Sequence, residues 1–167
     1  GRAAMLVCED AWHSITGTIA AVDGAQLLAV VAASPARGLT PDPAHPGQPV
    51  SLVRWDRVAQ EIAGEHGLYV ALTQLVGFEG GKGFPGGSIV ASPAGDIIAR
   101  APLFEDAMLP VALDLDEIAR ARAAAPLLAD LELKLPHLLE SLEQRRRARS
   151  TERDDVPAAP RPIPAGH

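Results

Sequence analysis

The sequence predicts an α/β fold with parallel strands. Apolar runs of strand length alternate with segments of helical period in its first half. The first run ends at Cys8, a short helical segment covers residues 14–23, and a second apolar run covers residues 26–33. A strand, a helix and a second strand form a βαβ unit, whose strands are parallel and end at the same sheet edge.

The composition predicts one soluble domain. Of 167 residues, 47% are hydrophobic and 22% are charged, and the net charge of -6 argues against a nucleic-acid or membrane-surface binder. The single cysteine excludes an internal disulfide, and the five scattered histidines predict neither a metal site nor another cofactor. No apolar run reaches membrane-spanning length, so we expect a cytoplasmic protein. The Gly-Arg opening without an initiator methionine indicates a fragment.

The strand from Ala3 delivers Cys8 to the edge of the sheet, where catalytic groups of α/β proteins usually lie. A lone cysteine is either a small core residue or a nucleophile, and the acids that follow favour the nucleophile. A helix over 14–23 ends at Gly24, and the second strand ends at Ser34. Because these strands are parallel, Cys8 and Ser34 are expected side by side.

The middle of the chain continues the alternation of strands, helices and loops. Residues 35–50 carry five prolines and form a loop, and an amphipathic helix over 52–66 ends at Gly67. The glycine-rich segment 77–87 lacks the context of a phosphate-binding loop. The sequence predicts a strand over 68–72, a loop over 77–87, a hairpin of 88–92 with 97–101, and a strand over 107–114.

The chain becomes helical after Asp116, with breaks expected near Pro126 and Pro136. Leucines between 127 and 142 form an apolar stripe that packs on the body or on a second subunit. The basic run 145–149 is interpreted as a solvated helix end rather than a nucleic-acid patch. We therefore divide the chain into the main domain (1–125), a helical extension (126–150) and a disordered proline-rich tail (151–167).

An ordered series of motifs resembles one known family. The series comprises Cys8-Glu9-Asp10-Ala11-Trp12, Ala33-Ser34-Pro35, Glu65 through Val70, Phe84 through Val90, Pro93 through Asp96, and Leu113-Asp114-Leu115. Over about residues 3–120 it resembles the C-terminal part of a carbon–nitrogen hydrolase domain of the nitrilase superfamily. It is most similar to the glutaminase domain of glutamine-dependent NAD synthetases, although no ATP-binding synthetase domain follows. The resemblance implies a four-layer α-β-β-α sandwich, here incomplete at its N-terminal side.

The resemblance also implies a mechanism. Enzymes of this family cleave amides through a cysteine thioester, with a glutamate as general base and a lysine and a backbone N–H as oxyanion donors. Cys8 matches the nucleophile, and the backbone of Glu9 matches the donor. The family's glutamate and lysine precede the cysteine, but none of the seven residues before Cys8 is Glu or Lys. Glu79 and Lys82 follow it, so we expect no amidase activity from this chain alone.

Further site residues follow from the same resemblance. Ser34 matches a residue that holds the substrate, and Arg37 is either a partner of the substrate carboxylate or a solvated loop residue. Trp12 either walls the pocket or packs in the core. Glu65 matches the acid of a supporting Glu-Asn pair, although His66 replaces the asparagine.

Three functions remain open at this point. The leading one is hydrolysis of a linear amide, with release of ammonia or an amine. The second is a glutaminase that supplies ammonia to an NAD synthetase-like partner, and the third is a non-catalytic binding protein with the same fold. We expect a small-molecule amide as the partner, no nucleic acid or membrane, a homo-oligomer at full length, and exposed apolar sheet faces in the fragment.

Overall fold

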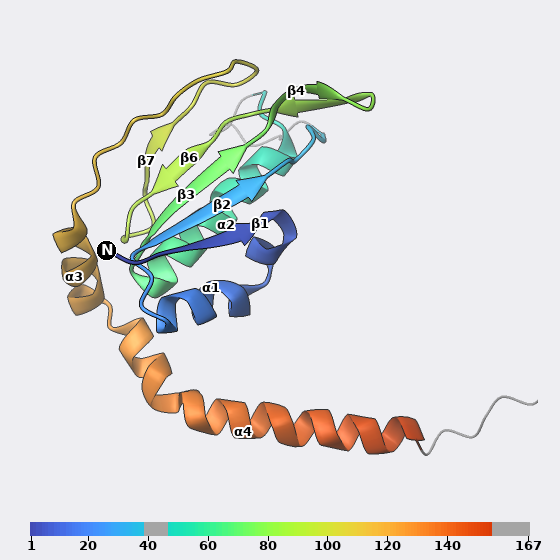
Figure 1. Cartoon of the computed structure of the whole chain (residues 1–167), viewed down its shortest axis with the longest axis vertical. Coiled ribbons are helices and arrows are strands. Elements are labelled where there is room, and N and C mark those ends of the chain that lie inside the picture. The colour runs from blue at the N-terminus through green and yellow to red at the C-terminus, as the bar shows by residue number, and fades with distance from the viewer. Residues whose placement is uncertain (39–46, 155–167) are drawn as a thin grey trace, which may run out of the picture. The chain divides into compact units, whose positions relative to one another are not determined.

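The computed structural model describes residues 1–38 and 47–154, and the described residues fall into two compact units divided between Asp130 and Leu131. The first unit holds a five-stranded sheet in the order β1-β2-β3-β6-β7 (Figure 1). Its strands are β1 (Ala3–Val7), β2 (Leu27–Ala32), β3 (Tyr69–Gln74), β6 (Ile89–Ala91) and β7 (Ile97–Arg100). The mixed α/β fold predicted from the sequence is confirmed.

The three N-terminal strands are parallel. Val7 of β1 lies opposite Val31 of β2, which lies opposite Thr73 of β3. The helix α1 (Ser14–Val22) connects the first pair, and α2 (Val50–His66) connects the second. The carboxyl ends of β1, β2 and β3 therefore meet at one edge of the sheet, as the βαβ pattern predicts.

The antiparallel part of the structure corrects two predictions. The segment 77–87 is not a loop, because β4 (Val76–Glu79) pairs with β5 (Lys82–Pro85) in a separate hairpin. Gly80 and Gly81 form its turn with φ angles of 55° and 75°, which glycine adopts without strain. The strand predicted over 107–114 is absent from the described structure, whereas the predicted hairpin of β6 with β7 is confirmed.

One face of the sheet packs against α1 and α2 and forms the main core (Figure 1). Alternate strand residues such as Leu28, Val30, Val70 and Leu72 point into this core and are almost fully buried. Trp55 of α2 packs there too, at 3% exposure. The helices thus fix the positions of β2 and β3, whose ends carry the candidate site.

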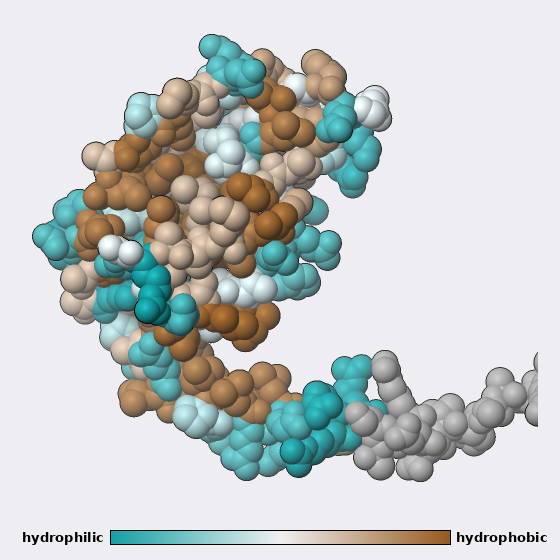
Figure 2. Space-filling model, in the orientation of Figure 1, coloured by the Kyte–Doolittle hydropathy of each residue, from teal (hydrophilic) through white to brown (hydrophobic). Residues whose placement is uncertain are grey.

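The opposite face of the sheet is covered only in part. Tyr69, Val90 and Ile118 of α3 (Leu115–Ala124) form a second buried cluster beneath the extended segment 109–113. Nearer the carboxyl ends of the strands, Met5 and Val7 are 66% and 58% exposed. Apolar side chains extend across this side of the molecule in Figure 2. The expected exposure of an apolar sheet face is confirmed.

The C-terminal part is helical, as predicted. The first predicted helix break is present, but the second is absent. A break between α3 and α4 (Leu127–Asp154) falls at Pro126, whereas Pro136 lies inside α4. In α4, Leu133 and Leu142 are 83% and 62% exposed. The predicted disordered tail (151–167) starts too early, because α4 continues to Asp154. Residues 155–167 of that tail and residues 39–46 of the proline-rich loop lie outside the described residues. None of the helices in the described ranges is long and apolar enough to span a membrane.

Candidate active site

Cys8 lies in a tight turn at the carboxyl end of β1. The strand ends at Val7, and Cys8 opens a 3-10 helix, η1 (Cys8–Trp12), with a φ of 46°. The left-handed region is uncommon for residues other than glycine and costs conformational energy. Oδ2 of Asp10 accepts a hydrogen bond from the backbone N–H of Val7 at 3.1 Å. The predicted strand, which was expected to end at Cys8, therefore ends one residue earlier, at Val7, because the chain turns at Cys8.

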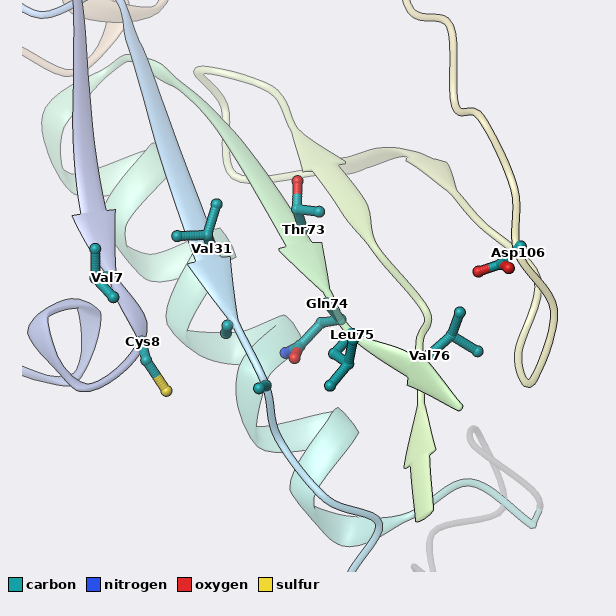
Figure 3. Close-up of a pocket in the computed structure, with 10 residues that line it drawn as sticks. Val7, Cys8, Val31, Thr73, Gln74, Leu75, Val76 and Asp106 are labelled. Atoms are coloured by element: carbon teal, nitrogen blue, oxygen red, sulfur yellow. The ribbon is translucent and has the colours of Figure 1, made fainter. Parts of the chain in front are cut away.

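A cavity of about 570 Å³ opens over the ends of β1, β2 and β3, and Cys8 lies on its wall (Figure 3). Its lining is Val7, Cys8, Val31, Ala32, Ala33, Thr73, Gln74, Leu75, Val76 and Asp106. Most of these side chains are apolar. The cavity therefore suits a small, largely apolar group held against the thiol.

Gln74, the last residue of β3, is the most buried polar side chain of this cavity, at 7% exposure. Its Oε1 accepts a hydrogen bond from the backbone N–H of Ser34 at 3.3 Å, which joins the end of β3 to the segment after β2. Its backbone N–H donates to Oγ of Ser88 at 3.0 Å. Its Nε2 is buried and has no hydrogen-bond partner in the described part of the chain.

Three predicted site residues, Trp12, Ser34 and Arg37, line a second cavity of about 220 Å³. Arg54 and Trp55 of α2 complete much of its wall. Trp12 is 44% exposed, and its ring meets that of Trp55 edge-on at a centroid distance of 4.9 Å. The structure thus groups these three residues, but in a different cavity from the one lined by Cys8.

The loop that carries Arg37 is fixed by Ser51, in the first turn of α2. The backbone N–H of Arg37 donates to Oγ of Ser51 at 3.2 Å, and that hydroxyl donates to the carbonyl of Pro35 at 3.0 Å. The Arg37 side chain is exposed on this cavity wall. This arrangement is compatible with both interpretations of Arg37, as an anion partner and as a solvated arginine.

The two predicted glutamates lie outside both cavities. The Glu9 side chain is 87% exposed and lies 3.8 Å from Nε2 of His13, while its backbone N–H is in the first turn of η1. Glu65 is exposed on α2 and lines neither cavity. Its neighbour His66 is buried instead, with ring contacts to the Ile62 carbonyl and the Thr18 hydroxyl at 2.9 and 3.0 Å.

Few ionisable groups surround the thiol. Among the described residues that line its cavity, Asp106 is the one carboxylate, and no lysine or histidine is present. Glu79 and Lys82 face each other across the β4–β5 hairpin, are exposed and do not line the cavity. No group of three or more His, Cys, Asp or Glu in the described ranges could hold a metal ion.

Sequence reasoning missed Gln74 and Asp106. Glutamine at the end of an apolar strand gives no distinctive chemical signal, although its position next to the ends of two other predicted strands was available from the βαβ pattern. Asp106 lies in the irregular segment after β7, which the sequence did not place relative to the sheet. Both residues line the cavity only because the chain folds so that they lie close to Cys8.

The comparisons with known proteins agree on a family. The family model for carbon–nitrogen hydrolases matches residues 1–123. The carbon–nitrogen hydrolase of Helicobacter pylori G27 superposes with a TM-score of 0.69 at 26% identity, over 83% of this chain and 49% of that one. A variant of the amidase from Nesterenkonia sp. AN1 superposes with a TM-score of 0.53 at 30% identity, over 73% of this chain and 42% of that one, and in it acrylamide has added to the active-site cysteine.

Curated relatives include two glutamine-dependent NAD(+) synthetases. The Thermotoga maritima protein is 30% identical over 127 residues, which are 75% of this chain and 20% of that protein. The Aquifex aeolicus protein is 35% identical over 118 residues, which are 70% of this chain and 19% of that protein. The chain thus spans about a fifth of the length of these relatives.

Proposed function

The chain belongs to the carbon–nitrogen hydrolase family, and we propose that it carries the nucleophile of an amide-hydrolysing site at Cys8. The observation that carries this proposal is the thiol itself. It lies on a largely apolar cavity at the ends of three parallel strands, on a residue held at a φ of 46°. A strained backbone at a reactive side chain is typical of active sites, where surrounding contacts offset its cost.

The chemistry follows from the weak reactivity of amides. The Cys8 thiolate attacks the carbonyl carbon, and the resulting tetrahedral intermediate expels the nitrogen as ammonia or an amine after it takes up a proton. A water molecule then attacks the thioester, which releases the carboxylic acid and restores the thiol. The backbone N–H of Glu9 is the proposed donor to the negative oxygen of each tetrahedral intermediate.

Such a site also needs a general base and a cation near the developing charge. The described lining of the Cys8 cavity contributes neither a lysine nor a glutamate. We therefore propose that these groups come from outside the described residues, next to the uncovered sheet face with Met5 and Val7. On this proposal, the 167-residue chain alone releases no ammonia from amides.

The first test is selective alkylation of Cys8. The protein is treated with acrylamide at neutral pH, and the rate of adduct formation is followed by mass spectrometry, with Cys8→Ala as the blank. We expect modification that saturates with acrylamide concentration, because a bound amide precedes the reaction. A rate no greater than that of a free thiol, without saturation, would contradict the nucleophile proposal.

A second candidate function is glutamine hydrolysis for a synthetase partner. Its support is the identity of 30% and 35% to two glutamine-dependent NAD(+) synthetases. On this alternative, glutamine competes with acrylamide for Cys8, whereas propionamide does not. The non-catalytic alternative instead predicts that acrylamide reacts with Cys8 no faster than with a free cysteine.

A further inference from the structure

The cavity lined by Cys8 contains a second polar group without an assigned role, the side-chain amide of Gln74. Gln74 is 7% exposed, and its Nε2 has no hydrogen-bond partner in the described structure. Buried amide nitrogens are normally hydrogen-bonded, and those left without a partner call for a physical explanation. A bound ligand with an acceptor oxygen would provide that partner.

The hydrogen bond to Ser34 decides which end of the amide is oxygen and which is nitrogen. Oε1 of Gln74 accepts from the backbone N–H of Ser34, so the nitrogen takes the other position of the amide. In Figure 3 the Gln74 side chain extends from the end of β3 toward the end of β2, on the side where Cys8 lies. The terminal torsion of glutamine has a broad energy minimum, so a small rotation can turn the N–H toward the cavity.

We propose that Nε2 of Gln74 donates a hydrogen bond to an acceptor oxygen of the amide substrate bound over Cys8. This inference rests on the proposed amide-hydrolysing function and adds to it a substrate-binding residue and a substrate class. The other walls of the cavity are mostly apolar, from Val7, Val31 and Leu75. The preferred ligand is therefore a small amide with an apolar acyl chain and a carbonyl oxygen within reach of Gln74.

The alternative is a purely structural Gln74, which holds the Ser34 segment through Oε1 alone. Two substitutions separate these roles. Gln74→Glu keeps an oxygen acceptor for the Ser34 N–H but removes the N–H donor, whereas Gln74→Met removes both. A structural role predicts that Gln74→Glu behaves like the parent protein. A binding role predicts that both variants lose amide affinity.

The experiment uses the ¹⁵N-labelled protein with Cys8→Ser, so that no covalent step follows binding, and propionamide as the probe. The side-chain NH₂ signals of Gln74 are assigned by their loss in Gln74→Glu. We expect these signals to shift saturably with propionamide, and we expect both Gln74 variants to bind it at least about fivefold more weakly, the effect of one lost hydrogen bond.

The matched control is Gln60→Met. Nε2 of Gln60 already donates to the Gly95 carbonyl at 3.0 Å, and Gln60 does not line the cavity. This variant therefore loses a half-buried glutamine without changing propionamide affinity. Unshifted Gln74 signals, parental affinity in Gln74→Glu, or no propionamide binding would each overturn the inference. Inertness of Cys8 toward acrylamide together with a saturable Gln74 shift would refute the nucleophile and leave the Gln74 donor standing.

Discussion

The carboxylate of Asp10 accepts a hydrogen bond from the backbone N–H of Val7 at 3.1 Å, across the turn that contains Cys8. This bond closes the end of β1 onto the 3-10 helix η1. Between the two bonded residues, Cys8 has a φ of 46°, which its side chain disfavours. The side chain of Asp10 thus stabilises the backbone conformation in which the thiol lies on the cavity.

Asp10→Ala should therefore relax this turn. We expect a loss of about 1 kcal/mol of stability, as for removal of a helix-capping carboxylate, and slower acrylamide modification of Cys8. Asp10→Asn keeps an acceptor oxygen and should retain most of both properties. Urea unfolding and adduct mass spectrometry measure the two effects. Equal modification rates in Asp10→Ala and the parent would show that the bond does not position the thiol.

Arg122 of α3 binds the end of α2 at Gly67, which has a φ of 58°. Nε of Arg122 donates to the carbonyls of His66 and Gly67 at 3.2 and 3.1 Å. A Cβ on Gly67 would lie 2.7 Å from Cγ of Arg122. Gly67→Ala should therefore cost more than the roughly 1 kcal/mol expected for the backbone alone, because Arg122 must also move.

Gly24→Ala is the control for this prediction. Gly24 has a φ of 89° after α1, and the nearest atom to a Cβ there, Nη1 of Arg2, lies at 3.7 Å. Its substitution adds backbone strain without a clash. Chemical denaturation of both variants should show the larger loss for Gly67→Ala, and equal losses would mean that Arg122 shifts freely.

The sequence was sufficient for most of the sheet that carries the site. The βαβ pattern identified β1, β2 and α2 to within a few residues, because continuous apolar runs and helical periodicity are local signals. The β4–β5 hairpin was not predicted, because a segment rich in glycine is also typical of an irregular loop. A Gly80-Gly81 pair between the apolar Val76 and Phe84 is nonetheless a two-residue turn signal.

Other errors arise from tertiary structure. Leu109, Val111 and Leu113 alternate as in a strand, but they pack on the open face of the sheet without pairing with an edge strand. The grouping of Trp12, Ser34 and Arg37 away from the Cys8 cavity likewise depends on how α2 packs. The unpaired side-chain nitrogen of Gln74 could not be predicted, because hydrogen-bond satisfaction is a property of the folded chain.

Asp56 of α2 and Arg100 of β7 form a largely buried ion pair with two hydrogen bonds. Nη1 of Arg100 donates to Oδ1 of Asp56 at 3.2 Å, and Nη2 donates to Oδ2 at 2.8 Å. Asp56 is 3% exposed, so its carboxylate depends on Arg100 for charge compensation. Arg100→Ala should destabilise the protein by roughly 3 kcal/mol, the low end of the range for breaking a buried pair, because the Arg100 side chain is itself 29% exposed.

The exposed pair of Arg120 with Asp114 provides the comparison, since both side chains are more than half exposed at a separation of 2.6 Å. Arg120→Ala should change urea unfolding little, because water screens this pair. If Arg100→Ala lowered the free energy of unfolding no more than Arg120→Ala, the buried pair would not stabilise the protein more than the exposed pair.

Tyr69 is the single tyrosine of the chain, so its ionisation can be followed directly. The pKa of Tyr69 is raised to about 12. The largest cause is burial of the hydroxyl, followed by its hydrogen bond to Glu117 and by the negative charge of that residue. Its hydroxyl donates to the carbonyl of Asp114 at 3.0 Å and to Oε2 of Glu117. We expect tyrosinate absorbance to appear at about pH 12 in the folded protein and near pH 10 once it is unfolded in urea.

The sign of the stability change follows from this difference. The protonated hydroxyl is favoured in the folded state, so its contribution is fully present below the unfolded pKa of about 10. It is lost as the pH rises from there through the folded value of about 12. Glu117→Gln keeps an acceptor but removes the charge, and it should lower the Tyr69 pKa while leaving it above the unfolded value, because burial remains. A folded-state titration near pH 10 in the parent protein would instead mean that Tyr69 is solvated and that α3 does not pack over it.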